Sequence, residues 1–210
     1  MEQKNSYQEI IQIFKEFSIN GNSNTELDTR IFEEVNNFIA FHSEYELFEN
    51  VSASQIVFFL KRTHSYFLNK KLPEIEQAIG WSYGNDVFSI FIQDFFTKMK
   101  TDLLEHIIME EKKLFPYILY LENGIENRLI QDLLEKGYCI DQYESEHNDQ
   151  VEAEINKVKE TILKTKDKAH NPLAYQLLIN KLDTLELELR LHALIEDEIL
   201  IPKVIELEKI

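Results

Sequence analysis

The strongest constraint on this chain is that histidines and glutamates interrupt otherwise apolar helical stripes. In residues 86–121, apolar side chains recur every three or four positions, and His106 and Glu110 occupy two places in that series. This spacing puts side chains on one face of an α-helix. His192 and Glu196 interrupt a second stripe in the same way. Because an unpaired buried carboxylate is costly, these groups must satisfy one another or bind something.

The two His-x3-Glu segments belong to an internal repeat. In both copies, an acid, a leucine, a large apolar residue and a proline follow at the same offsets, and the copies end at Pro116 and Pro202. His64 and His147 lie on two further stripes and fit the same duplication. We therefore expect two helical hairpins that each supply a histidine and then a His-x3-Glu motif around one axis.

The predicted fold is all-α. The chain has 210 residues, enough for a sizeable core, and its 5 glycines and 4 prolines are too few for an all-β sandwich. Residues 1–50 are expected to form an N-terminal helical cap or subdomain. Residues 51–210 are expected to form an antiparallel four-helix bundle, with the third helix bent near Gly137. The four expected helices span 52–80, 86–121, 125–166 and 172–208.

Charge and composition exclude several partners. The net charge of −16 disfavours binding to nucleic acid, because an acidic chain repels phosphate backbones. No run of about 18 apolar residues is present to span a membrane. The single cysteine, Cys139, cannot form an internal disulfide, and the N-terminus does not resemble a signal peptide. We therefore expect a cytoplasmic protein.

The side chains on the stripes form a plausible metal-ligand set. Imidazole suits iron, copper, zinc and nickel, and carboxylates suit harder ions. Four histidines and two glutamates are enough for two ions bridged by the glutamates. Iron fits a carboxylate-bridged pair of ions inside a helical bundle best. Zinc and manganese are the alternative metals. The expected ligands are His64, His106, Glu110, His147, His192 and Glu196; no catalytic residue is assigned.

The doubled motif resembles the hemerythrin-like di-iron proteins. In the two copies, His106-x3-Glu110 precedes Leu-Phe-Pro, and His192-x3-Glu196 precedes Leu-Ile-Pro. Within that family, the chain is most similar to the bacterial branch that repairs iron-sulfur clusters and other iron centres damaged by nitric oxide or oxidants. The resemblance covers about residues 52–206.

The resemblance implies a function in the response to nitric oxide or oxidative stress. The protein would carry two iron ions in a carboxylate-bridged centre. It would bind O2, NO or peroxide as small ligands, or repair damaged iron-sulfur proteins as partners. The alternative is an iron- or redox-sensing module whose N-terminal segment, residues 1–50, signals to a protein partner.

Two departures from the repair branch bear on the site. That branch often begins with a small domain bearing a Cys-Cys pair, whereas this chain has one cysteine. It also has an additional histidine ligand, whose counterpart here would fall in the segment Ser82–Asp86, which contains none. We expect solvent to hold that coordination position, or Tyr83 or Asp86 to hold it weakly.

The remaining histidines and acids receive simpler interpretations. His42 and His170 lie off the stripes and are expected at the surface. Glu144 and His147 form one Glu-x-x-His, the ferritin-type signature, but that site requires a second copy, which the sequence lacks. The acids that flank the expected ligands are predicted to be solvated; they are Glu111, Asp197 and Glu198.

Overall fold

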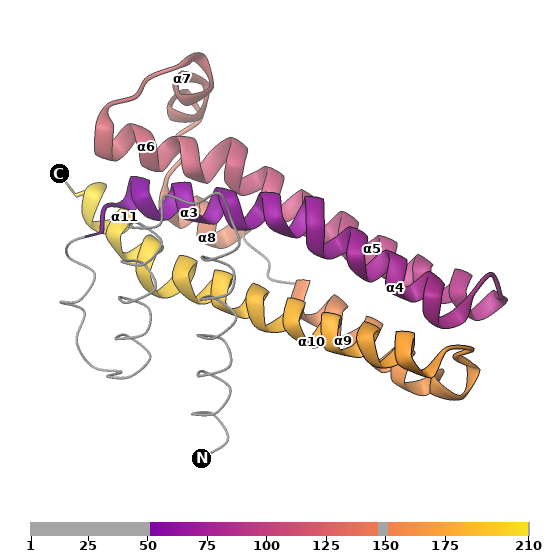
Figure 1. Ribbon diagram of the computed structural model, residues 1–210. Helices are drawn as coiled ribbons and strands as arrows, with labels where there is room; N and C mark the ends of the chain where they lie inside the picture. The colour runs from indigo at the N-terminus through magenta and orange to yellow at the C-terminus, as the bar shows by residue number, and fades with distance from the viewer. Residues whose placement is uncertain (1–50, 147–150, 210) are drawn as a thin grey trace. The chain divides into compact units, whose positions relative to one another are not determined.

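The computed structural model describes residues 51–146 and 151–209. Within these ranges every regular element is a helix and no strand is present, which confirms the all-α prediction there (Figure 1). The elements are α3 (Ala53–Tyr66), η2 (Phe67–Lys71), α4 (Leu72–Tyr83), α5 (Val87–Met109), η3 (Glu110–Leu114), α6 (Phe115–Asn123), α7 (Arg128–Glu135), α8 (Ile140–Glu146), α9 (Val151–Lys164), η4 (Lys166–Lys168), α10 (Pro172–Ile195), η5 (Glu196–Leu200) and α11 (Ile201–Leu207).

Three of the predicted long helices are present as helical rods. The first consists of α3, η2 and α4, the second of α5, η3 and α6, and the third of α10, η5 and α11. The prediction of one bent helix over 125–166 was wrong, because α7 ends at Glu135 and α8 begins only at Ile140. Gly137 ends the helical run after α7 with a φ of 72°, where a side chain would be strained. There the Tyr138 N–H donates to the Leu133 carbonyl at 3.0 Å.

Each rod contains a five-residue π-helix that ends two residues before a proline. The π-helices η2, η3 and η5 are followed by Leu72-Pro73, Phe115-Pro116 and Ile201-Pro202. A proline inside an α-helix lacks an N–H and clashes with the carbonyl four residues earlier. In η2 and η5, the N–H of the residue before the proline instead reaches the carbonyl five residues back. The disturbance that Pro73 causes in the helix therefore takes the form of a wider helical turn.

The described residues fall into two compact units. The first unit contains residues 51–61, 115–140 and 190–209, and the second contains 62–114, 141–146 and 151–189. The expected cap at residues 1–50 lies outside the described residues.

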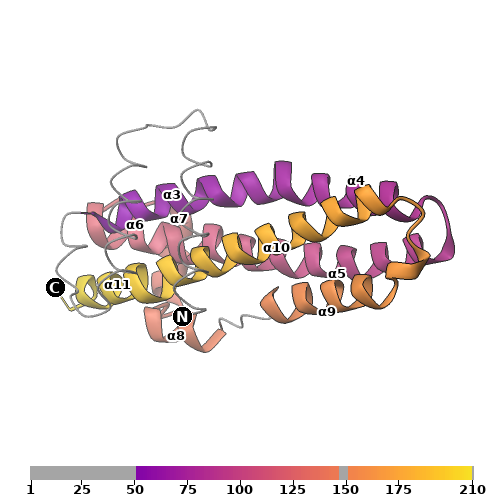
Figure 2. The same ribbon diagram turned by 60° about the horizontal axis from the view of Figure 1, so that its bottom comes forward.

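The core of the second unit is lined by α4, α5, α9 and α10. Ile79, Ile92, Ile162 and Leu182 are among its fully buried members. A short turn joins α4 to α5, and another joins α9 to α10, so each pair runs antiparallel (Figures 1 and 2). These four segments give the second unit one continuous apolar interior.

Polar contacts fix the two turns of the second unit. Gly84 has a φ of 64°, and the Asp86 side chain accepts the Phe88 N–H at 2.7 Å to cap α5. The backbone N–H of His170, in the other turn, donates to the Ser82 carbonyl at 2.8 Å. The two turns therefore lie together at one end of this unit.

In the first unit, Glu208 ties the end of the chain to two other segments. Its Oε1 accepts the Tyr117 hydroxyl at 2.6 Å and the Ile140 N–H at 2.8 Å. The Tyr117 ring packs edge-on against Tyr138, with 5.2 Å between ring centroids. These contacts hold α6 and the start of α8 to the residues after α11.

Candidate metal centre

The second unit brings together three of the six predicted ligands. His64 lies in the last turn of α3, His106 in the last turn of α5, and Glu110 begins η3. The apolar stripe around each residue buries its helix face, so His64 is 1% exposed and Glu110 is fully buried. The side chain of His106 is 15% exposed. These groups therefore meet in an environment with little water.

The carboxylate of Glu110 lies between the two imidazoles. Its Oε2 is 2.9 Å from His64 Nε2, and its Oε1 is 2.5 Å from His106 Nε2. Each oxygen thus has its own imidazole partner. Burial penalises the charged carboxylate, and a proton on either imidazole or a bound cation would offset this penalty.

A fourth side chain, Glu111, joins this group. Its Oε1 lies 2.9 Å from Nδ1 of His64, and its side chain is 34% exposed. The prediction that Glu111 is merely solvated was wrong. The sequence carried a partial signal, because the repeat places an acid after each ligand glutamate, but it did not indicate the histidine partner.

The first unit contains the second His-x3-Glu pair. His192 lies at the end of α10, and Glu196 begins η5. Both are buried, at 6% and 1% exposure, and His192 Nε2 lies 3.9 Å from Glu196 Oε2. The repeat in the sequence is therefore also a repeat in structure, because each ligand glutamate starts a π-helix.

Sequence reasoning missed these π-helices, although a signal was present. Pro116 and Pro202 follow their glutamates at the same distance, and each forces the preceding turn to widen. Pro73 follows Phe67 at that distance, so the first rod has the same backbone feature with an apolar residue in the glutamate position.

Other predicted site residues lie outside the described part. His147, the side chain of Glu144 and His42 fall among the residues whose structure is not described here. The predicted fourth histidine ligand, the ferritin-type alternative and the surface position of His42 therefore stay predictions. His170 is at the surface as predicted, with its side chain 64% exposed and its Nε2 3.0 Å from Asp86 Oδ2.

The prediction that Tyr83 or Asp86 could bind the metal was wrong. About 19 residues of helical rod separate His64 from Tyr83, which corresponds to roughly 28 Å along a helix. The Tyr83 hydroxyl lies 3.1 Å from Thr165 Oγ1, and burial raises its pKa. Asp86 caps α5, and the backbone N–H groups of that cap lower its pKa.

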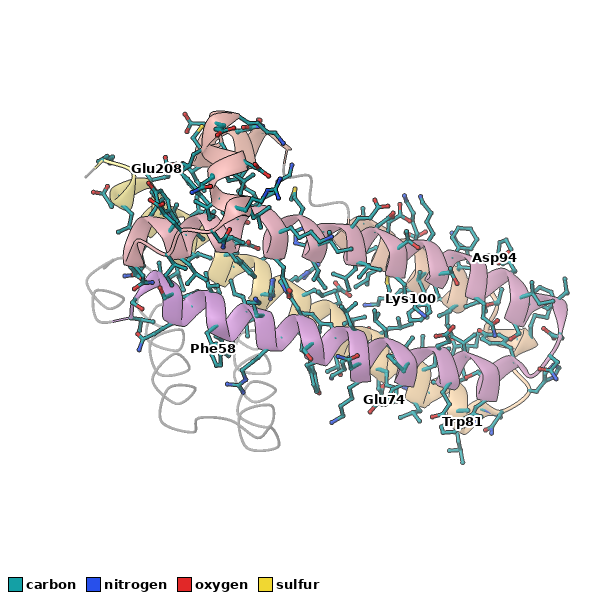
Figure 3. All side chains as sticks on the ribbon, turned by 90° about the horizontal axis from the view of Figure 1, so that it is seen from above. Phe58, Glu74, Trp81, Asp94, Lys100 and Glu208 are labelled. Atoms are coloured by element: carbon teal, nitrogen blue, oxygen red, sulfur yellow. The ribbon has the colours of Figure 1, made fainter. Side chains whose placement is uncertain are left out.

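The first helix extends beyond its predicted end at residue 80. α4 continues to Tyr83, so Gly80 lies inside the helix. Trp81 lies on the outer surface of α4, 54% exposed (Figure 3). Ser82 and Tyr83 therefore belong to α4, and Gly84 to Asp86 form the turn before α5.

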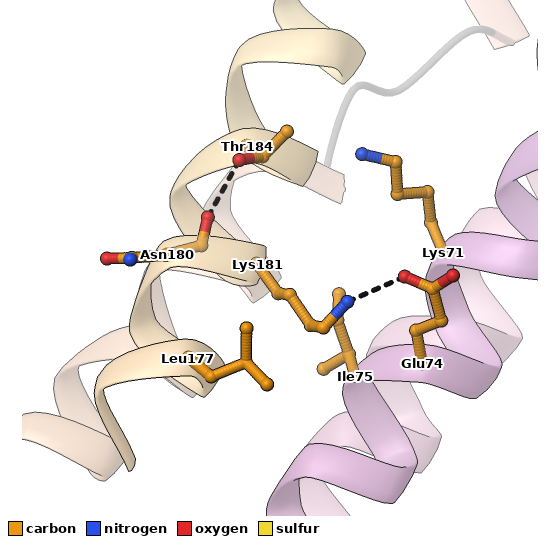
Figure 4. Close-up of a pocket in the computed structure, with 7 residues that line it drawn as sticks. All are labelled: Lys71, Glu74, Ile75, Leu177, Asn180, Lys181 and Thr184. Atoms are coloured by element: carbon orange, nitrogen blue, oxygen red, sulfur yellow. Dashed lines mark hydrogen bonds and ion pairs between the residues drawn. The ribbon is translucent and has the colours of Figure 1, made fainter. Parts of the chain in front are cut away.

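A separate pocket lies between α4 and α10 in the second unit. Its cavity volume is about 250 Å³, and its lining includes Lys71, Glu74 and Lys181 (Figure 4). Lys181 Nζ contacts Glu74 at 2.6 Å, and Lys71 Nζ contacts the buried Glu188 at 2.7 Å. Both lysines are thus neutralised by carboxylates, and the pocket carries little net charge to attract an ion.

The described donors fit a transition-metal ion. Buried His and Glu side chains of this chain could hold such an ion, and imidazole nitrogen with carboxylate oxygen is a donor set that iron accepts. No helix in the described ranges is long and apolar enough to cross a membrane. No protein-family model, curated protein or solved structure matches the chain.

Proposed function

We propose that this chain is a hemerythrin-like di-iron protein in which a four-helix bundle holds two iron ions. Glu110 and Glu196 would bridge the ions. The histidines would be terminal ligands; they are His64, His106, His147 and His192. The protein would act in the cytoplasm in the response to nitric oxide or oxidative stress, by repairing iron centres or by binding O2, NO or peroxide.

The observation that carries this proposal is the position of the Glu110 carboxylate. One of its oxygens contacts an imidazole from α3, and the other contacts an imidazole from α5. A carboxylate that bridges two ions needs this arrangement, with one oxygen and one terminal imidazole for each ion. A single ion would not require both oxygens to face separate histidines.

The internal repeat supports the inclusion of His192 and Glu196. They reproduce the spacing, the burial and the π-helix of His106 and Glu110. We therefore propose that the two pairs serve the same ions rather than two separate centres.

The chain's residues and the bound iron would have different tasks. Bound iron would supply an open coordination position for a diatomic ligand or peroxide. The imidazoles and carboxylates would hold that iron in a dry interior. The missing counterpart of the family's additional histidine leaves one such position without a protein ligand in this proposal. Damaged iron-sulfur proteins are the partners that the repair function would need.

The test is the metal content and visible spectrum of protein purified from iron-supplied cells. We expect about two iron ions per chain, because six nitrogen- and oxygen-donating side chains suit two ions. The matched control is His170→Ala, which removes an exposed histidine and should leave iron content unchanged. If wild-type protein holds at most one metal after reconstitution, the dinuclear proposal is wrong.

A further inference from the structure

Glu111 contacts the ring nitrogen of His64 that Glu110 does not contact. The distances are 2.9 Å from Glu111 Oε1 to Nδ1 and 2.9 Å from Glu110 Oε2 to Nε2. Glu110 is fully buried, whereas the Glu111 side chain is 34% exposed. The two ring nitrogens of His64 therefore face different surroundings, one interior and one at the edge of the site.

The local backbone allows two consecutive glutamates to serve one imidazole. Neighbouring residues on a regular α-helix do not face the same partner. Here, both residues belong to the π-helix η3, which has a wider turn than an α-helix. Pro116, just after η3, disfavours a regular α-helix at this point.

The chemistry of the two nitrogens then assigns their roles. A neutral imidazole has one N–H donor and one lone pair, and an ionised carboxylate only accepts hydrogen bonds. If Glu111 accepts from Nδ1–H, the lone pair lies on Nε2, which faces Glu110. A metal ligand needs that lone pair, and metal-bound histidines usually donate their other N–H to a carboxylate or carbonyl.

We propose that Glu111 is a positioning residue that keeps the His64 proton on Nδ1 and so leaves Nε2 free to bind the metal. This inference rests on the proposed function. It also predicts the consequence of losing Glu111. Glu110 would still lie beside Nε2, where its carboxylate would accept from Nε2–H and draw the proton onto the ligand nitrogen.

The experiment uses the full chain, labelled with 15N-histidine, and compares four proteins. They are wild type, Glu111→Leu, Glu111→Gln and Glu105→Gln. Glu111→Gln keeps an acceptor oxygen, and Glu105→Gln removes one exposed negative charge on α5 as the charge-matched control. Ring-nitrogen NMR of metal-free protein locates the proton on the neutral His64 ring, with His64→Gln used to assign its signals. Competition with a chelator measures Zn²⁺ affinity, because Zn²⁺ accepts the same donors and is diamagnetic.

We expect the proton of the neutral His64 ring to lie on Nδ1 in wild type and in Glu105→Gln. In Glu111→Leu it should shift toward Nε2. Zn²⁺ affinity should fall by about 10- to 100-fold in Glu111→Leu, the range typical for such partners, and less in Glu111→Gln. If the His64 proton position and the Zn²⁺ affinity are unchanged in Glu111→Leu, the positioning role is wrong. This result would not contradict the metal site itself. If wild-type protein binds no Zn²⁺ and no iron, both the metal site and the positioning role are wrong.

Discussion

Nε2 of His64 lies 2.9 Å from Oε2 of Glu110, and both side chains are almost completely buried. The two residues come from different helical rods, so tertiary packing is needed to bring them together. An imidazole nitrogen and a carboxylate oxygen held this close in a buried site could share a metal ion.

In the proposed centre, loss of one bridging glutamate should release both ions. Glu110→Ala is expected to lower iron content from about two per chain to nearly none, whereas His64→Ala should leave about one, because the proposed bridging glutamates are shared between the ions and His64 is not. Elemental analysis of the two purified variants measures this difference. Circular dichroism would confirm that each variant keeps its helices. Equal losses in both variants would contradict the bridging role.

Removal of the metal should lower the melting temperature. Ligands that bind only the folded state stabilise it by about 2.7 kcal/mol at a free concentration 100 times Kd. We therefore expect chelated protein to melt below iron-loaded protein in differential scanning calorimetry, and re-addition of iron to restore the transition. A melting temperature that does not respond to chelation would argue against a metal bound by these residues.

Replacement of Pro116 should separate metal affinity from stability. Pro116→Ala restores an N–H and removes the reason for η3, since proline inside an α-helix costs about 3 kcal/mol. We expect metal affinity to fall roughly 10-fold as the glutamates reorient. The free energy of unfolding of the metal-free protein should not decrease. Pro73→Ala is the matched control. It should leave metal affinity unchanged, because η2 begins with Phe67, which is not a metal-ligand candidate.

The buried pair of Lys71 and Glu188 should make stability depend on pH. Burial raises the pKa of Glu188 above its ordinary value of 4.5, and the nearby Lys71 only partly opposes this shift. The folded protein therefore holds this proton more tightly than the unfolded chain. The free energy of unfolding is thus highest below pH 4.5 for this group and falls as pH rises through the raised pKa.

Glu188→Gln should remove that dependence. Urea unfolding of metal-free protein between about pH 4.5 and 8 should show the variant gaining stability relative to wild type as pH rises. The control is Glu76→Gln, which alters a more exposed pair with Lys100. A stability difference between Glu188→Gln and wild type that is constant with pH would contradict the buried-carboxyl explanation.

Tyr83→Phe should leave the metal centre intact. The hydroxyl contacts Thr165 and the Ile162 carbonyl, far along the rod from His64, so its loss should cost about 1 kcal/mol of folding stability. Iron content and the visible absorption spectrum should match those of wild type. Loss of an absorption band in this variant would restore Tyr83 as a ligand.

Much of the helical structure could be predicted because helix faces are encoded locally. Apolar residues every three or four positions identified three of the rods and placed His106, Glu110, His192 and Glu196 on buried faces. The third predicted helix failed because an apolar stripe continues in register across Gly137, whereas the backbone there adopts a positive φ that ends the helix.

The sequence by itself determined which side chains share a helix face, because that depends only on residue spacing. Tertiary structure alone decided which faces meet and at what height along the rods. It brought His64 to Glu110 and Glu111, and it put Tyr83 and Asp86 in the turn region of the second unit. Glu110 and Glu196 each begin a π-helix that precedes a proline, so the backbone at both glutamates departs from a regular α-helix. Residue spacing repeats at every turn of a helix, so it cannot show at which height along a rod a side chain meets its partner. Only packing between rods makes that distinction.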